Sequence, residues 1–158
     1  MSVTRDIVAS WRRPRAVMRS HLARPKSEPF AFSLLVTFLV VAFVAQWPAA
    51  SRDSLLHPEV PMTQRLVAAS LALLALVPFW YLLAAIGHWV ARLLGAGGDH
   101  YRARLALFWA LVTVTPLMLL QGLVSGMIGP GPALTSVSVL AGLVFLTFWV
   151  VNLNEAGR

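Results

Sequence analysis

The chain has 158 residues, of which 58% are hydrophobic and only 12% are charged, and its mean hydropathy is +0.74. Because soluble domains carry charge on roughly a quarter of their residues, this composition excludes an ordinary soluble protein and predicts an integral membrane protein. The basic residues behind the net charge of +7 lie beside hydrophobic stretches, so we interpret them as a signal of membrane topology and expect no nucleic-acid partner. The absence of cysteine excludes disulfides and thiolate chemistry.

Residues 1–29 form a basic segment with seven Lys and Arg against two acids. Apolar side chains recur there at spacings of four and seven, the pattern of an apolar helix face: Val3, Ile7, Trp11, Met18 and Leu22. Pro14 suits a first helical turn, so we expect two amphipathic helices broken near Arg13 that lie on the membrane surface. The side chains expected at anionic lipid headgroups are Arg12, Arg13, Arg15 and Arg19. The alternative is a loose basic tail that only fixes topology.

Four apolar stretches follow, each long enough to cross a hydrocarbon core of ~30 Å. They cover residues 30–47, 66–91, 105–128 and 133–153, and they leave a tail at 154–158. Prolines at 48, 58 and 61 oppose a long helix, so an irregular loop is predicted from Pro48 to Arg65. The sequence therefore predicts an all-α integral membrane protein with four transmembrane helices, preceded by a basic amphipathic interfacial segment.

The basic residues also predict the orientation. Eleven Lys and Arg lie in the N-terminal segment, in residues 92–104 and in the tail, against two in the loops on the opposite side. Both termini are therefore expected in the cytoplasm. Arg outnumbers Lys twelve to one, a bias typical of GC-rich bacterial genomes, so we expect a bacterial inner membrane. Interfacial positions are predicted for Trp11, Trp47, Trp89, Trp109 and Trp149.

The spans contain no Asp, Glu, Lys or Arg, which weighs against ion-coupled transport and against catalysis. The four histidines are scattered over different segments, so no metal or cofactor site is predicted. Ser125 and His88 lie on the order of 25 Å apart in depth, which excludes a serine protease pair. We therefore expect that the protein is not an enzyme.

Pro78 and Pro116 both fall near the bilayer midplane in the predicted hairpin of spans two and three. Each proline frees the carbonyl four residues earlier, at Leu74 and Val112, and threonine hydroxyls in span three can compensate. The favoured interpretation is packing curvature. The alternative is a small midplane pocket of a carrier or channel, formed by Pro78, Trp80, Tyr81, Thr115 and Pro116.

A stripe of small and polar residues follows the helical spacing of span three: Gln121, Gly122, Ser125, Gly126 and Gly129. Small residues let transmembrane helices approach closely, so this stripe predicts a helix-contact face. Its partner stays open between span four, another copy of the chain and another protein.

Several local features together resemble the Yip family of membrane proteins, in its bacterial branch: Pro14 before the first span, the Gly97-Gly98 turn, Tyr101, Phe108-Trp109 and Pro116. The resemblance implies a short cytoplasmic lead followed by a helical bundle. Eukaryotic members associate with Rab-type GTPases and are implicated in shaping membranes, whereas a bacterial member has no Rab partner. Family members usually have five spans, so the four found here imply a lost span or a bundle completed by a partner.

We therefore expect a non-enzymatic inner-membrane protein that organises lipid or docks as an accessory subunit on a larger membrane complex. It would use its basic segment at the anionic cytoplasmic leaflet and the Gly122/Gly126 face within the membrane. The expected partners are anionic lipids and a membrane protein or a second copy, with no cofactor. The alternative is a small carrier or channel with a site at the two prolines.

Overall fold

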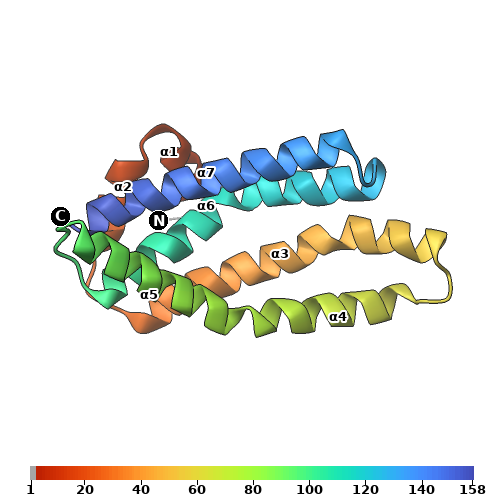
Figure 1. The fold of residues 1–158 in the computed structure, drawn as a ribbon, viewed down its shortest axis with the longest axis horizontal. Coiled ribbons are helices and arrows are strands. Elements are labelled where there is room, and N and C mark those ends of the chain that lie inside the picture. Colours follow the sequence, from red (N-terminus) through yellow and green to blue (C-terminus); the bar gives the residue numbers. More distant parts are fainter. Residues whose placement is uncertain (1–2) are drawn as a thin grey trace.

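The computed structural model describes residues 3–158, and these form seven helices (Figure 1). In chain order they are α1 (Val3–Arg12), α2 (Pro14–Leu22), α3 (Glu28–Leu56), α4 (Met62–Ala75), α5 (Val77–Leu93), α6 (His100–Met127) and α7 (Pro132–Ala156). Four segments are long and apolar enough to cross a membrane: α3, the consecutive α4 and α5, α6 and α7. The predicted all-α fold with four transmembrane helices is confirmed.

The bundle has two distinct ends (Figure 1). One end holds the C-terminus together with α1, α2 and the α5–α6 loop, and we call it the terminal end. The opposite end holds the α3–α4 and α6–α7 loops, and we call it the loop end. Helix α6 packs between α3 and α7, whereas α4 contacts only α3 and α5 among the described helices.

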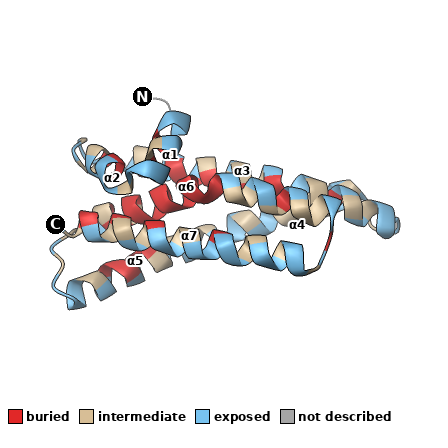
Figure 2. Cartoon of the chain, turned by 90° about the horizontal axis from the view of Figure 1, so that it is seen from above, coloured by how far each residue is buried: buried red, intermediate tan, exposed pale blue. Residues whose placement is uncertain are grey.

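The core of the protein is the first half of α6 (Figure 2). Every residue from 105 to 115 is buried, on all sides of the helix. This stretch is uncharged and almost wholly apolar, and a helix that is hydrophobic all round is stable only when other elements surround it. The first half of α6 is surrounded by five other helices, α1, α2, α3, α5 and α7. The second half of α6 lies toward the loop end and is largely exposed on one side.

The predicted irregular loop from residue 48 to 65 is wrong for most of its length. Helix α3 continues through Pro48 to Leu56, and α4 begins at Met62, so only residues 57–61 lie between them. Contact with α6 explains the extension, because the guanidinium of Arg52 donates to the carbonyls of Gly126 and Met127 at 3.5 and 3.4 Å. Arginine at a helix C-terminus satisfies carbonyls that have no partner within the helix.

The glycine-rich turn after α5 is folded against the end of α7. Gly95 adopts a φ of +86°, which ends α5 at a conformation that side chains with a Cβ rarely tolerate. The backbone N–H of Gly97 donates to the carbonyl of Gly157 at 2.8 Å. A Cβ at Gly98 would lie 2.8 Å from the carbonyl oxygen of Ala156, so this turn requires glycine for its close approach to α7.

Candidate functional site

The two span prolines behave differently from each other. Helix α6 continues through Pro116, and the hydroxyl of Thr115 donates to the carbonyl of Val112 at 2.7 Å, which satisfies the group that Pro116 leaves without its helical partner. At Pro78 the helix is interrupted instead, because α4 ends at Ala75 and α5 begins at Val77.

The predicted midplane pocket does not assemble around these prolines. Pro78 and Pro116 are both exposed on the outside of the bundle. The ring of Trp80 packs edge-on against Phe38 with centroids 5.5 Å apart, and the ring of Tyr81 packs edge-on against Phe108 at 5.3 Å. The two aromatic rings of α5 thus pack against α3 and α6. These contacts give no support to the hypothesis of a carrier with a midplane pocket.

The small-residue stripe of α6 faces other helices of the same chain. A Cβ at Gly122 would overlap the carbonyl oxygen of Ala45, and a Cβ at Gly126 would overlap the Cβ of Pro48. Both contacts are with α3. The side chain of Gln121 points the other way and donates to the hydroxyl of Ser138 in α7 at 2.9 Å. The Gly122/Gly126 face is therefore covered by α3 and does not offer a docking surface to a second protein.

The structure places the remaining stripe residues at the loop end. Ser125 lines a shallow pocket between α3, α6 and α7. Gly129 has a φ of +91°, and a Cβ there would lie 2.8 Å from the guanidinium carbon of Arg52. These two positions thus belong to the corner where α3 meets the α6–α7 hairpin.

The five tryptophans predicted at interfaces differ in their exposure and in their contacts. Trp47 and Trp89 are about half exposed. Trp11 lies against the bundle, where its indole N–H donates to the carbonyl of Thr113 at 3.2 Å. Trp149 stacks on Phe145 and covers Gly87 of α5. Trp109 is only 1% exposed and lies in the core of the protein, while its depth near a membrane interface stays a prediction.

Burial of Trp109 follows from the N-terminal helices, which fold back over α6. The indole N–H of Trp109 donates to the hydroxyl of Ser10 in α1 at 3.1 Å, and the imidazole of His21 in α2 lies 4.3 Å from the indole ring. Met18 is fully buried between the same elements. Helices α1 and α2 meet at Arg13 and together form a helical hairpin docked on α6 and α7, which we call the N-terminal hairpin.

A buried carboxylate ties the N-terminal hairpin to the end of α7. The side chain of Glu155 is only 3% exposed and lies 3.7 Å from Arg15, 3.8 Å from Arg19 and 3.3 Å from Arg158. These four residues form the Glu155 cluster. All four arginines predicted at lipid headgroups are exposed, and two of them, Arg15 and Arg19, also lie near the Glu155 carboxylate.

Two further ion pairs join the start of α3 to the start of α6. Lys26 pairs with Asp99, and Glu28 pairs with Arg104. Asp99 also caps α6 by accepting from the N–H of Arg102 at 2.8 Å. Burial raises the pKa of Asp99, but the Lys26 ammonium and the Arg102 N–H outweigh that effect and hold the pKa below its usual value. These two ion pairs hold the start of α3 against the start of α6 at the terminal end.

His21 is the buried titratable side chain of the N-terminal hairpin. Burial, followed by the charge of Arg24, lowers the pKa of His21 to about 4, although Asp6 at 4.0 Å acts in the opposite direction. Neither ring nitrogen has a hydrogen-bond partner. The imidazole is therefore neutral at pH 7 and packs as an aromatic ring between Trp109 and Phe30.

We expect the docking of the N-terminal hairpin to weaken in mild acid. The folded protein binds the His21 proton less readily than the unfolded chain, so the stabilisation is complete above pH 6.5 and declines as the pH falls toward about 4. The loss over this window is on the order of 3 kcal/mol. Thermal unfolding in detergent at neutral pH and at about pH 5 measures the first part of this loss, about 2 kcal/mol. In His21→Phe this part of the pH dependence should disappear, and an undiminished dependence would contradict the assignment.

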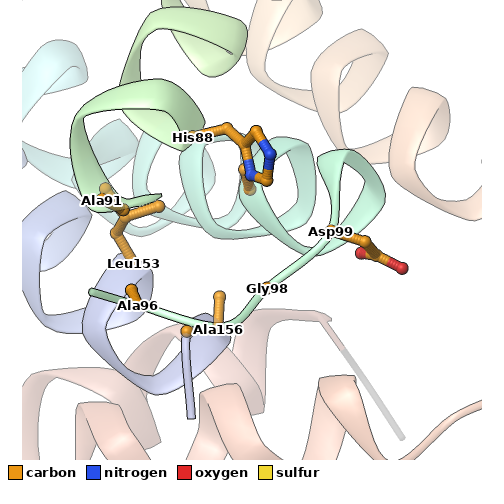
Figure 3. A pocket seen from close by; sticks show the side chains of 9 residues that line it. His88, Ala91, Ala96, Gly98, Asp99, Leu153 and Ala156 are labelled. Atoms are coloured by element: carbon orange, nitrogen blue, oxygen red, sulfur yellow. The ribbon is translucent and has the colours of Figure 1, made fainter. Parts of the chain in front are cut away.

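A histidine pair lies beside the α5–α6 loop. The rings of His88 and His100 are 4.1 Å apart, and His88 is buried. Figure 3 shows His88 and Asp99 around a small pocket that is closed by Gly98 and by Ala156 of α7. Among residues 3–158, no group of three or more His, Asp or Glu side chains is arranged to hold a metal ion.

Charge is distributed very unevenly between the two ends. Eleven of the thirteen Lys and Arg and four of the six acids lie at the terminal end. The loop end carries the remaining two bases and two acids, so the entire net charge of +7 belongs to the terminal end. This cationic end, built from the N-terminal hairpin, the α5–α6 loop and the end of α7, is the candidate functional site.

Sequence reasoning missed Glu155 as the residue that organises this site. It was assigned to a short tail, whereas α7 continues through it to Ala156. One signal was present, because Glu155 is the only acidic residue after Asp99 and directly follows an apolar span. An acid beside a span in a strongly basic chain is expected to pair with arginine.

The geometry defines a four-span helical membrane protein with one strongly cationic end. A family model described as the Yip1 domain matches residues 8–158. The chain therefore belongs to the Yip1 domain family, and the predicted resemblance to the Yip family is confirmed. No curated protein and no solved structure matches the chain significantly. Family membership and the four apolar helices together place the protein in a membrane.

Proposed function

We propose that this protein is a non-enzymatic organiser of anionic lipid in a bacterial inner membrane, with both termini in the cytoplasm. The observation that carries the proposal is the location of the whole net charge of +7 at the terminal end. Basic residues concentrate on the cytoplasmic side of membrane proteins, and each one near an anionic leaflet contributes about 1 kcal/mol of attraction.

The exposed surface of the N-terminal hairpin supports contact with lipid. Arg5, Arg12 and Arg13 are exposed, and so are the apolar side chains of Val3 and Val8. A helix that exposes both basic and apolar side chains suits the boundary between headgroups and acyl chains. The hairpin is fixed to the bundle by Ser10 and Met18, so it would hold lipid at a defined place beside the spans.

Lipid selectivity tests the proposal directly. The full-length protein is reconstituted into vesicles that contain spin-labelled phosphatidylglycerol or phosphatidylcholine, and the motionally restricted fraction of each label is measured. We expect phosphatidylglycerol to be selected, with a preference that declines in high salt because exposed charges are screened. Replacing Arg5 and Arg12 with glutamine should lower the preference, by up to about fivefold per charge.

The matched control removes one charge from the opposite end. Arg65→Gln changes the loop end without altering the contacts of Arg52 with α6, and it should leave the preference unaltered when compared with Arg5→Gln or Arg12→Gln alone. Equal selection of the two lipids by the unaltered protein would contradict the proposed function.

Docking as an accessory subunit is a second candidate, favoured by the exposure of α4. No residue of this helix is buried, and Val67, Leu71 and Leu74 follow one helical stripe while remaining about 60% exposed. A partner helix could cover that stripe. Mild extraction from the native membrane followed by native mass determination tests this role: a stoichiometric protein would support it, and a chain carrying only lipid would contradict it.

A further inference from the structure

A pocket of about 480 Å³ opens beside the Glu155 cluster, between the end of α5 and the end of α7. Its polar lining residues include Arg15 and Arg158, whose guanidinium groups lie near Glu155. Its other wall is apolar and continues along the two helices away from the terminal end, through Leu94, Leu153, Val90 and Val150. The pocket is therefore amphiphilic, with cations at one end and hydrocarbon at the other.

The charges at its polar end are not balanced within the protein. Glu155 supplies one negative charge, and the three arginines around it supply three positive charges. The carboxylate is buried, whereas the arginine side chains are 61 to 68% exposed. Each guanidinium carries five N–H donors, so contact with one carboxylate leaves donors directed elsewhere. This geometry suits a phosphate group, which arginine binds through paired N–H donors.

The apolar wall indicates a lipid as the source of the phosphate. Val90, Leu94 and Val150 are 49, 82 and 54% exposed, so they form an open hydrocarbon surface directly below the arginines. A free phosphate ion gains nothing from such a surface, whereas an acyl chain buries against it at about 25 cal/mol per Å². The pocket also lies where two spans end, which is the depth of the headgroups.

We propose that this pocket binds one anionic phospholipid, with its phosphate between Arg15 and Arg158 and an acyl chain along the groove between α5 and α7. This inference rests on the proposed function, because it names the place where anionic lipid is held. It adds a defined site to the general attraction of the cationic end. Glu155 acts as a positioning residue that keeps Arg15 and Arg158 side by side.

Native mass spectrometry of the detergent-purified full chain tests the site by titration with phosphatidylglycerol, phosphatidylcholine or inorganic phosphate. The informative variant is Leu94→Glu, which places a carboxylate at the mouth of the pocket and leaves the Glu155 cluster unaltered. Leu93→Glu is the matched control, because Leu93 is equally exposed at 85% but does not line the pocket. Arg158→Gln removes one of the two cations directly.

We expect one phosphatidylglycerol to bind, with an affinity reduced about tenfold in Leu94→Glu and in Arg158→Gln and unaltered in Leu93→Glu. Equal affinities in Leu94→Glu and Leu93→Glu would overturn the site. Displacement of the lipid by inorganic phosphate at similar concentration would overturn the assignment to lipid. Undiminished phosphatidylglycerol binding by Leu94→Glu in native mass spectrometry, together with a vesicle preference for anionic lipid, would refute this pocket while the proposed function stands, whereas no vesicle preference at all would refute both.

Discussion

Replacing Gly126 with leucine is expected to disrupt folding of the bundle. A Cβ at this position would overlap Pro48 and lie 2.6 Å from the carbonyl carbon of that residue, so the clash involves the backbone of α3. Overpacking typically lowers the free energy of unfolding by about 1–3 kcal/mol where side chains can move. Because a side-chain movement cannot relieve a clash with the backbone of α3, we expect the free energy of unfolding to fall by more than about 3 kcal/mol. Thermal unfolding in detergent should show a Tm lower by about 10 °C or a protein that does not fold.

Gly142 provides the matched control for this substitution. It lies in the middle of α7, and a Cβ there would meet no atom within 4 Å. Gly142→Leu should therefore leave the Tm almost unaltered. If Gly126→Leu were equally stable, the close contact between α3 and α6 would not exist as described. Loss of association with a partner while the monomer remains stable would instead restore the docking role predicted for this face.

Truncating Trp109 to alanine should cost about 3–5 kcal/mol, the usual range for a buried aromatic residue. The substitution removes the ring on which His21 packs and the donor that Ser10 accepts from. The N-terminal hairpin should therefore separate from α6. Thermal unfolding measures the loss of stability, and limited trypsin digestion after Arg12 reports the release of the hairpin.

Trp89→Ala is the corresponding control, because Trp89 is 57% exposed on the outside of α5. Its truncation should cost less than about 1 kcal/mol and should leave the hairpin resistant to trypsin. Equal effects of the two substitutions would mean that Trp109 does not hold the N-terminal hairpin on α6.

The number and order of the spans could be predicted from sequence because hydropathy and helix length are local properties. The end of α3 could not be predicted in this way. Pro48 indicates a helix end when α3 is considered alone, but the packing of Pro48 on Gly126 and the donation from Arg52 to α6 extend the helix. Those contacts join residues 74 to 78 positions apart, and no local pattern contains them.

The candidate site was predictable only in part for the same reason. Charge counting located the cationic end, since it requires no knowledge of packing. It could not show that Arg15 and Arg19 meet Glu155, because that contact depends on how the N-terminal hairpin folds back across α7. The position of Trp109 along its helix could be predicted from sequence. Its burial could not, because the residues of α1 and α2 that cover it lie some 90 to 100 positions earlier in the chain.

The docked N-terminal hairpin imposes an order on the biogenesis of this protein. Its docking surface consists of α6 and α7, which are synthesised after three other helices. While those helices enter the membrane, Trp109 and Glu155 do not yet exist, and α1 and α2 have no protein surface to cover. Transmembrane helices form first and associate afterwards. The basic N-terminal segment therefore remains undocked while the spans form, and the hairpin packs on α6 only in the last step of assembly.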